Sequence, residues 1–183
     1  MSPEKINTKK NRNTFISDEK QVILLNGPSS SGKSTLSRSL KKIIEDGCNK
    51  IYEIISIDDF MKIEEDETIY EDDVFEISGD MCNELQKLLQ SKDGVIIDHV
   101  ITSERIYEQL LEAVKEFDLI KVHVTCPVEI LIGRETARGN RCKGSAEDSF
   151  NYLYPKNGYD LTVDTSVLTS EEAASIIYEH IIE

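Results

Sequence analysis

The chain has 183 residues, of which 39% are hydrophobic and 31% charged, and its formal net charge is −14. This length and composition fit one globular domain with a sizeable core rather than a disordered chain. The acidic balance argues against broad binding to nucleic acids, because few basic side chains remain to neutralise a phosphate backbone. The sequence contains neither an apolar run of membrane-spanning length nor a signal-peptide pattern. We therefore expect a cytoplasmic protein that binds no membrane.

The first residues differ in character from the rest of the chain. Residues 1–20 are polar and aperiodic, so we expect a flexible leader ahead of a single domain over residues 21–183. The domain opens with an apolar run at residues 22–25, which predicts a strand covered on both faces. Apolar residues at helical spacing from residue 33 to about residue 45 predict a helix, which Gly47 is expected to end.

Between this strand and this helix lies the pattern G-x-x-x-x-G-K-S. Its glycines allow backbone amides to converge on a phosphate, and the following helix points its positive dipole end at the same place. Lys33 is expected to reach the β- and γ-phosphates, and Ser34 to offer its hydroxyl to Mg²⁺. The predicted nucleotide-binding residues of this loop are Gly27, Ser29, Ser30, Ser31, Gly32, Lys33, Ser34 and Thr35.

Strand-like and helix-like segments continue to alternate along the chain. Further strands are predicted at residues 51–57, 94–100, 119–125 and 161–163. Further helices are predicted at about 73–90, at 103–117 and directly after Pro127. A short helix that ends at about residue 154 and a closing helix follow, and Thr169 and Glu172 form a capping box for the closing helix. This alternation predicts an α/β fold, a three-layer α/β/α sandwich with a five-stranded parallel sheet, as in small kinase-like P-loop nucleoside-triphosphate hydrolases.

Two carboxylates are expected to lie at the sheet edge that holds the loop. Asp58 follows the second predicted strand and Asp98 lies in the third, and the carboxyl ends of parallel strands meet at one edge. We expect Asp58 to accept the proton of an attacking hydroxyl and Asp98 to serve Mg²⁺ or the acceptor; the reverse assignment is open. Phe60 and His99 are further candidates to contact the acceptor, although a lone histidine beside a strand is more often structural.

A basic cluster near the end of the chain stands out against the net charge of −14. Arg134, Arg138 and Arg141 occur together, with glycines beside them. Guanidinium groups bind phosphate oxygens well, and glycines permit movement, so we expect a lid at about residues 134–150 that binds the nucleotide. Arg138 is also expected to stabilise the transferring phosphoryl group. The alternative is an exposed basic helix end that interacts with its own dipole.

These residues together supply what phosphoryl transfer needs, which is a positioned donor, neutralised charge and an oriented nucleophile. The guanine-reading tetrapeptide N-K-x-D of regulatory GTPases is absent from the sequence. We therefore predict an enzyme that moves the γ-phosphate of ATP to a hydroxyl of a small molecule. The alternatives are a nucleoside, nucleotide or other metabolite kinase of the same fold, and a non-catalytic nucleotide-binding module. The sequence leaves open the acceptor, the purine preference and the oligomeric state.

Several segments resemble the chloramphenicol phosphotransferase-like kinases. They are I-L-L-N-G-P-S-S-S-G-K-S at 23–34, I-D at 57–58, I-I-D at 96–98, G-R-E-T-A-R-G-N-R at 133–141 and G-Y-D-L-T-V-D-T-S at 158–166. The resemblance implies an ATP- and Mg²⁺-dependent kinase, similar to chloramphenicol 3-O-phosphotransferase, that phosphorylates a small-molecule hydroxyl. It implies Asp58 as the general base, Lys33 as a phosphate ligand, and Arg134, Arg138 and Arg141 as lid groups.

Overall fold

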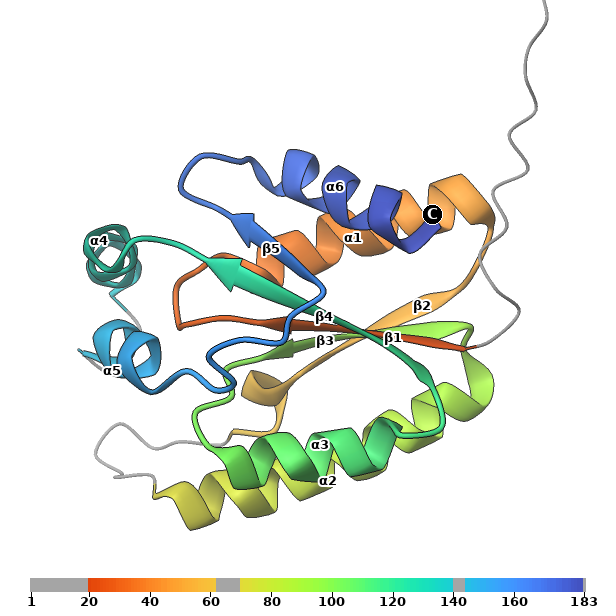
Figure 1. The fold of residues 1–183 in the computed structure, drawn as a ribbon, viewed down its shortest axis with the longest axis horizontal. Coiled ribbons are helices and arrows are strands. Elements are labelled where there is room, and N and C mark those ends of the chain that lie inside the picture. Colours follow the sequence, from red (N-terminus) through yellow and green to blue (C-terminus); the bar gives the residue numbers. More distant parts are fainter. Residues whose placement is uncertain (1–19, 62–69, 140–143, 183) are drawn as a thin grey trace, which may run out of the picture.

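The computed structural model describes residues 20–61, 70–139 and 144–182 of the chain. Its centre is a sheet of five parallel strands in the order β2-β3-β1-β4-β5 (Figure 1). The strands are β1 (Gln21–Asn26), β2 (Tyr52–Ser56), β3 (Gly94–His99), β4 (Asp118–Thr125) and β5 (Leu161–Asp164). The predicted parallel α/β sheet is therefore confirmed, while residues 1–19 of the expected leader lie outside the described residues.

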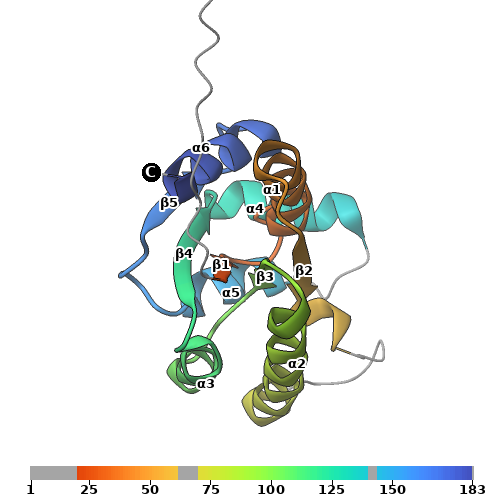
Figure 2. The ribbon, with the colours of Figure 1, turned by 90° about the vertical axis from the view of Figure 1, so that its right-hand side faces the viewer.

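Helices cover both faces of the sheet (Figures 1 and 2). One face carries α1 (Lys33–Cys48) and α6 (Ser170–Ile182), and the other carries α2 (Glu71–Ser91) and α3 (Glu104–Val114). Alternate residues of β1 serve the two cores: Ile23 and Leu25 pack with α1 and α6, whereas Val22 and Leu24 pack with α2 and α3. The three-layer sandwich is thus confirmed. Within the described ranges, no helix is both long and apolar enough to cross a lipid bilayer.

The carboxyl ends of the central strands meet at one edge of the sheet. Leu25 at the end of β1 pairs with Asp98 of β3, and Asp98 also pairs with Ser56 at the end of β2. A single 3₁₀ turn, Ile57–Asp59, follows β2 directly. The helices α4 (Val128–Arg138) and α5 (Ser145–Tyr152) lie beyond the same edge (Figure 1). Segments distant in the sequence therefore converge where ligands bind in open α/β sheets.

The prediction that Gly47 ends the first helix is wrong. Helix α1 continues to Cys48 and ends at Asn49, which adopts the left-handed conformation with φ 55° and ψ 31°. A Cβ atom on Gly47 would lie 2.3 Å from the hydroxyl oxygen of Tyr178 on α6. The glycine therefore allows α1 and α6 to approach closely, and the asparagine takes the capping position expected for a glycine.

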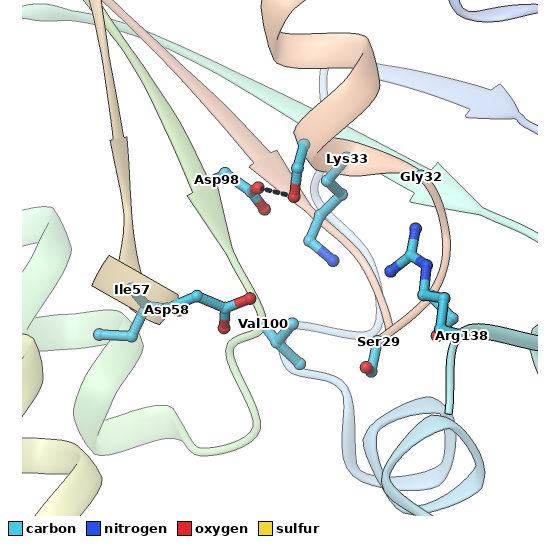
Figure 3. A pocket seen from close by; sticks show the side chains of 10 residues that line it. Ser29, Gly32, Lys33, Ile57, Asp58, Asp98, Val100 and Arg138 are labelled. Carbon is cyan, nitrogen blue, oxygen red and sulfur yellow. Dashed lines mark hydrogen bonds between the residues drawn. The ribbon is translucent and has the colours of Figure 1, made fainter. Parts of the chain in front are cut away.

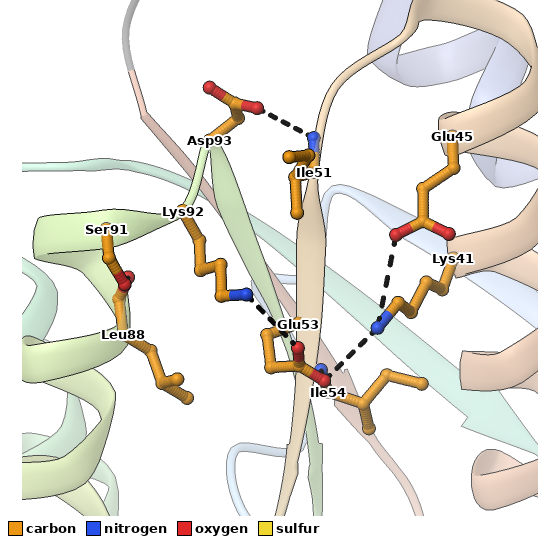
Figure 4. Close-up of polar contacts among 9 residues, drawn as sticks. All are labelled: Lys41, Glu45, Ile51, Glu53, Ile54, Leu88, Ser91, Lys92 and Asp93. Carbon is orange, nitrogen blue, oxygen red and sulfur yellow. Dashed lines mark hydrogen bonds and ion pairs between the residues drawn. The ribbon is translucent and has the colours of Figure 1, made fainter.

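The edge strand β2 is protected by charged side chains (Figure 4). Glu53 of β2 accepts a hydrogen bond of 3.1 Å from Lys41 on α1 and lies 3.6 Å from the amine of Lys92, just after α2. The Asp93 carboxylate accepts a hydrogen bond of 2.7 Å from the backbone N–H of Ile51. Charges of this kind on an edge strand disfavour pairing with another chain, and here they also connect the two helical layers.

Candidate functional site

The loop after β1 is a narrow backbone turn that packs against β4. A Cβ atom on Gly27 would lie 2.2 Å from the carbonyl oxygen of Val124 and 3.1 Å from Ser31 Oγ, so only glycine permits this approach. Farther along the loop, Ser30 and Gly32 adopt left-handed conformations with φ values of 65° and 90°. Such alternating conformations turn successive backbone N–H groups toward one point. The predicted phosphate loop thus has the shape of an anion cradle.

Ser30 carries a buried polar atom that a bound phosphate would satisfy. Its side chain is 4% exposed, and its hydroxyl has no hydrogen-bond partner within the described ranges. A buried hydroxyl without a partner costs free energy, and a non-glycine residue with positive φ is strained. Residues with a strained backbone conformation or an unpartnered buried polar group are concentrated at ligand sites. The cradle therefore fits a nucleotide phosphate on grounds independent of the sequence motif.

Positive charge gathers at the start of α1. Gly32 is the N-cap of this helix, no side chain caps it, and its first turn contains no acidic residue. The first backbone N–H groups and the helix dipole therefore face the cradle. The buried Lys33 amine donates hydrogen bonds to the carbonyl oxygen of Pro28 at 2.9 Å and to Ser31 Oγ at 3.5 Å. This arrangement suits an anionic ligand such as a phosphate.

Ser34 and Asp98 form a pair of oxygen donors beside the cradle. The Ser34 hydroxyl donates a hydrogen bond of 2.6 Å to Asp98 Oδ2, and Asp98 is 5% exposed. Hydroxyl and carboxylate oxygens are the ligands that Mg²⁺ prefers, so the pair fits this cation. Within the described residues, no group of three or more His, Cys, Asp or Glu side chains is placed to bind a metal. A cation held by this pair would therefore need further ligands from phosphate oxygens and water.

One pocket unites these groups (Figure 3). It is lined by Ser29, Ser30, Gly32, Lys33, Ser34, Ile57, Asp58, Asp98, Val100 and Arg138. The carboxylate of Asp58, the amine of Lys33 and the guanidinium of Arg138 point into the same space from different sides. Sequence analysis named these three residues but did not name Ile57 or Val100 as site residues, although both lie at predicted strand ends and Ile57 belongs to the I-D segment of the family resemblance.

Several predicted residues do not line this pocket. Gly27 is buried against β4, Ser31 is fully buried, and Thr35 is exposed on the first turn of α1. Phe60 is partly buried and packs against the core beneath α2 and α3. Arg141 lies outside the described residues, as does the stretch 140–143 of the expected lid.

His99 is fully buried rather than exposed to the pocket. Neither nitrogen of its imidazole has a hydrogen-bond partner within the described residues. Burial lowers the pKa of His99 to about 4; the backbone of Val100 and the charge of Asp58 oppose this shift, whereas the positive charge of Lys33 adds to it. The imidazole is therefore neutral at physiological pH, and its position does not support direct contact with an acceptor in this conformation.

Arg134 connects the phosphate loop to the loop after β5. Its guanidinium donates hydrogen bonds to the carbonyl oxygen of Thr165 at 2.7 Å, to Thr165 Oγ1 at 3.1 Å and to the carbonyl oxygen of Ser30 at 3.5 Å. Thr165 in turn donates a hydrogen bond of 2.7 Å to the carbonyl oxygen of Ser31. Arg134 and Arg138, both predicted as lid groups, thus have different surroundings: Arg134 joins two loops, whereas Arg138 faces the pocket. Thr165 belongs to the segment 158–166, which resembles that of the chloramphenicol phosphotransferase-like kinases.

The expected lid includes a helix that is attached to the cradle. The buried Ser149 on α5 accepts a hydrogen bond of 2.9 Å from the backbone N–H of Ser29. The start of α5 is bound by the buried carboxylate of Glu135 on α4, which accepts hydrogen bonds from Gly144 N, Ser145 Oγ and Ala146 N. Sequence analysis assigned no role to either residue: Ser149 lies outside the recognised motifs, whereas Glu135 lies between the arginines of the segment 133–141 that carries the family resemblance. Movement of residues 134–150 stays a prediction.

Comparison with known proteins identifies the family and the fold. Residues 20–182 match the family described as "Chloramphenicol phosphotransferase-like protein", whereas no curated protein matches the sequence. The Mycobacterium tuberculosis APS kinase CysC, in complex with AMPPNP and APS, superposes with a TM-score of 0.70 at 16% identity, over 89% of this chain and 98% of that chain.

Two further solved structures share the architecture. The shikimate kinase from Acinetobacter baumannii, in complex with shikimate, has a TM-score of 0.60 at 19% identity, over 90% of this chain and 94% of that chain. The Deinococcus radiodurans tunicamycin resistance protein has a TM-score of 0.62 at 17% identity, over 88% and 95% of the two chains. At these identities the similarity shows the P-loop kinase fold, which confirms the predicted fold class.

Proposed function

The chain belongs to the chloramphenicol phosphotransferase-like protein family, and on this premise we propose that it is a kinase. The proposed reaction transfers the γ-phosphate of ATP to a hydroxyl of a small molecule. The observation that carries the proposal is one pocket in which the uncapped start of α1 and the Lys33 amine face the carboxylate of Asp58. A phosphate site and a candidate base for a hydroxyl thus share one space, as phosphoryl transfer requires.

In the proposed donor half, the cradle binds the phosphates of ATP. The backbone N–H groups at Ser30 and Gly32, together with the first turn of α1, hold the phosphate oxygens. The Lys33 amine exchanges its contact with the Pro28 carbonyl for phosphate oxygens, which are stronger acceptors because they are charged. Arg138 lines the pocket opposite Asp58 and is proposed to stabilise charge on the transferring group.

Ser34 and Asp98 are proposed to hold Mg²⁺. Bound there, Mg²⁺ neutralises phosphate charge and orients the terminal phosphate. The Ser34 hydroxyl would supply one oxygen ligand, and the buried Asp98 carboxylate, 2.6 Å from it, would bind the cation directly or through water. This pairing favours Asp98 over Asp58 as the metal residue, because Asp58 is exposed and lies on the other side of the pocket.

Asp58 is proposed to act as the general base. Its carboxylate accepts the proton of the acceptor hydroxyl while that oxygen forms a bond to the γ-phosphorus and the bond to the β-phosphate oxygen breaks, which releases ADP. The partly exposed side chain of Val100 lines the pocket beside Asp58 and offers an apolar surface for an uncharged part of the acceptor, whereas Ile57 is buried in the core. An alcohol of the kind that chloramphenicol presents suits this combination.

The proposal is tested with γ-labelled ATP and a panel of acceptors that contains chloramphenicol, nucleosides, nucleoside monophosphates and sugar alcohols. We expect transfer to an alcohol other than a nucleoside or nucleotide, and we expect Asp58→Asn to lower turnover by about 10²- to 10⁴-fold while nucleotide affinity changes little. Asp59→Asn is the matched control, because Asp59 occupies the same 3₁₀ turn but is not among the residues that line the pocket.

Two results would contradict the proposal. Transfer only to nucleosides or nucleoside monophosphates would assign the chain to the alternative class of nucleotide-metabolising kinases. Tight binding of ATP without transfer to any acceptor, and unchanged behaviour of Asp58→Asn, would instead indicate a non-catalytic nucleotide-binding module.

A further inference from the structure

A buried amide connects the start of the phosphate loop to two other loops. Asn26, the last residue of β1, is fully buried. The Nδ2 and Oδ1 atoms of its side chain form hydrogen bonds with other parts of the protein. Its Oδ1 accepts a hydrogen bond of 3.0 Å from the backbone N–H of Ile101. Its Nδ2 donates hydrogen bonds of 2.8 Å to the carbonyl oxygen of Tyr154 and to the hydroxyl of Tyr159.

The first of these partners belongs to the acceptor side of the pocket. Ile101 follows Val100, which lines the pocket beside Asp58. The Ile101 carbonyl oxygen accepts a hydrogen bond of 2.9 Å from the backbone N–H of Tyr154, so the two loops are also joined to each other. Displacement of either loop therefore leaves polar atoms around Asn26 without partners, and each such buried group costs about 1–3 kcal/mol.

The second group of partners belongs to the segment between α5 and β5. The Tyr159 hydroxyl donates a hydrogen bond of 2.9 Å to the carbonyl oxygen of Pro155, and its ring stacks on His123 of β4 at a centroid distance of 4.8 Å. The preceding helix, α5, contacts the phosphate loop through Ser149. The cradle, the loop at Ile101 and the segment 154–159 thus form one hydrogen-bonded unit around Asn26.

We propose that Asn26 is a positioning residue that couples nucleotide binding in the cradle to the placement of the acceptor-side loop at Val100 and Ile101. The inference rests on the proposed function, because the nucleotide must bind beside Asn26. The physical basis is linkage. A ligand that binds the ordered arrangement stabilises every segment whose local opening would disturb its site. Asn26 stands immediately before Gly27, so a displacement of the start of the cradle also displaces the amide that bonds to Ile101 and Tyr154.

Hydrogen–deuterium exchange with AMPPNP and Mg²⁺ as probes tests this inference on the full chain. In the unmodified protein, AMPPNP is expected to slow exchange of the amides in the cradle and also, by about tenfold or more at one hundred times its Kd, of the Ile101 and Tyr154 amides. Asn26→Ala should abolish the second effect and retain the first.

A milder variant covers the case in which Asn26→Ala does not fold. Tyr159→Phe removes one hydrogen-bond acceptor of Asn26 Nδ2 but preserves the ring that stacks on His123. We expect the AMPPNP effect at Ile101 to fall below about threefold in this variant while the cradle stays protected. Tyr152→Phe, at a side chain that is 68% exposed, is the matched control and should behave as the unmodified protein.

The outcomes distinguish the proposed role of Asn26 from the proposed binding of a nucleotide in the cradle. Protection of the cradle without any effect at Ile101 in the unmodified protein, or an undiminished effect in Tyr159→Phe, overturns the role of Asn26 and leaves the proposed kinase intact. Absence of AMPPNP protection in the cradle itself overturns nucleotide binding there, and the inference falls with it. A purely structural role would lower stability in Tyr159→Phe without changing the response of Ile101 to AMPPNP.

Discussion

Gly27 offers the sharpest test of the cradle geometry, because the structure specifies what a single added methyl group would meet. In Gly27→Ala, the new Cβ would be placed 2.2 Å from the carbonyl oxygen of Val124, almost 1 Å closer than such atoms approach in proteins. The obstacle is backbone, and it belongs to β4, which pairs with β1 along its length. Neither strand can rotate away as a side chain would.

The cost of this collision follows from the forced backbone shift. Overpacking of a well-packed site costs about 1–3 kcal/mol, and a clash with backbone belongs at the upper end of that range. For a chain of this size, about 3 kcal/mol lowers the Tm by roughly 6–12 °C. Gly133→Ala is the matched control, since no atom lies within 4 Å of its added Cβ and the position is in the interior of α4. It should raise the stability by up to about 1 kcal/mol.

Differential scanning calorimetry and titration with AMPPNP measure both consequences. We expect Gly27→Ala to melt at the lower temperature and to bind AMPPNP at least about tenfold more weakly, because the displaced amides no longer converge. Gly133→Ala should bind AMPPNP normally. If Gly27→Ala melts within about 1 °C of the unmodified protein and keeps its affinity, the close packing of the cradle against β4 is refuted.

Three further predictions concern single side chains. Ser34→Ala removes the hydroxyl bonded to Asp98, so the Mg²⁺ concentration for half-maximal activity should rise about 10- to 100-fold in the labelled-ATP assay. Glu135→Gln replaces a carboxylate oxygen by an amide group that faces N–H donors at the start of α5, so urea titration should show a loss of about 1–3 kcal/mol. Burial raises the pKa of the Cys82 thiol from its ordinary value of 9.0 to about 11. Its alkylation by iodoacetamide at pH 8 should therefore be about a hundredfold slower in the native protein than in the urea-unfolded chain, as followed by mass spectrometry.

Each of these predictions has a control variant or a control measurement. Thr35→Ala alters an exposed hydroxyl next to Ser34 and should leave the Mg²⁺ dependence unchanged, so an equal effect of both variants contradicts the role of Ser34. Glu129→Gln, at an exposed acidic residue of the same helix as Glu135, should keep full stability. Alkylation of Cys82 at the same rate in native and unfolded protein would contradict its burial.

Sequence patterns predicted the structural features that depend on residues close together in the chain. The strand, the glycine-rich loop and the helix around Gly27 and Lys33 follow from local periodicity and backbone preference, and alternation of such units implies a parallel sheet. The meeting of Asp58 and Asp98 at one edge also followed, because the handedness of the crossovers is the same in nearly all parallel sheets. These inferences needed no knowledge of which side chains touch.

Contacts between distant segments were beyond the reach of such reasoning. Gly47 has the local signature of a helix end, yet its role is to accommodate Tyr178, which is 131 positions later in the chain. His99 has a chemistry that suits a substrate contact, but the packing around β3 buries it completely. Arg134 and Arg138 look alike in the sequence, and only the position of Thr165 on a neighbouring loop gives them different surroundings.

Asn26 illustrates the difference between what the local sequence specifies and what the tertiary structure decides. The residues from Asn26 to Ser34 specify a phosphate cradle on their own, because backbone conformation and helix start are local properties. The partners of its amide, Ile101, Tyr154 and Tyr159, follow 75 or more positions later in the chain. No local pattern encodes which of them will meet a buried amide, since that depends on how β3, α5 and β5 pack around β1. The form of the phosphate loop was therefore readable from short motifs, whereas the placement of the loop at Val100 and Ile101 depends on the assembled fold.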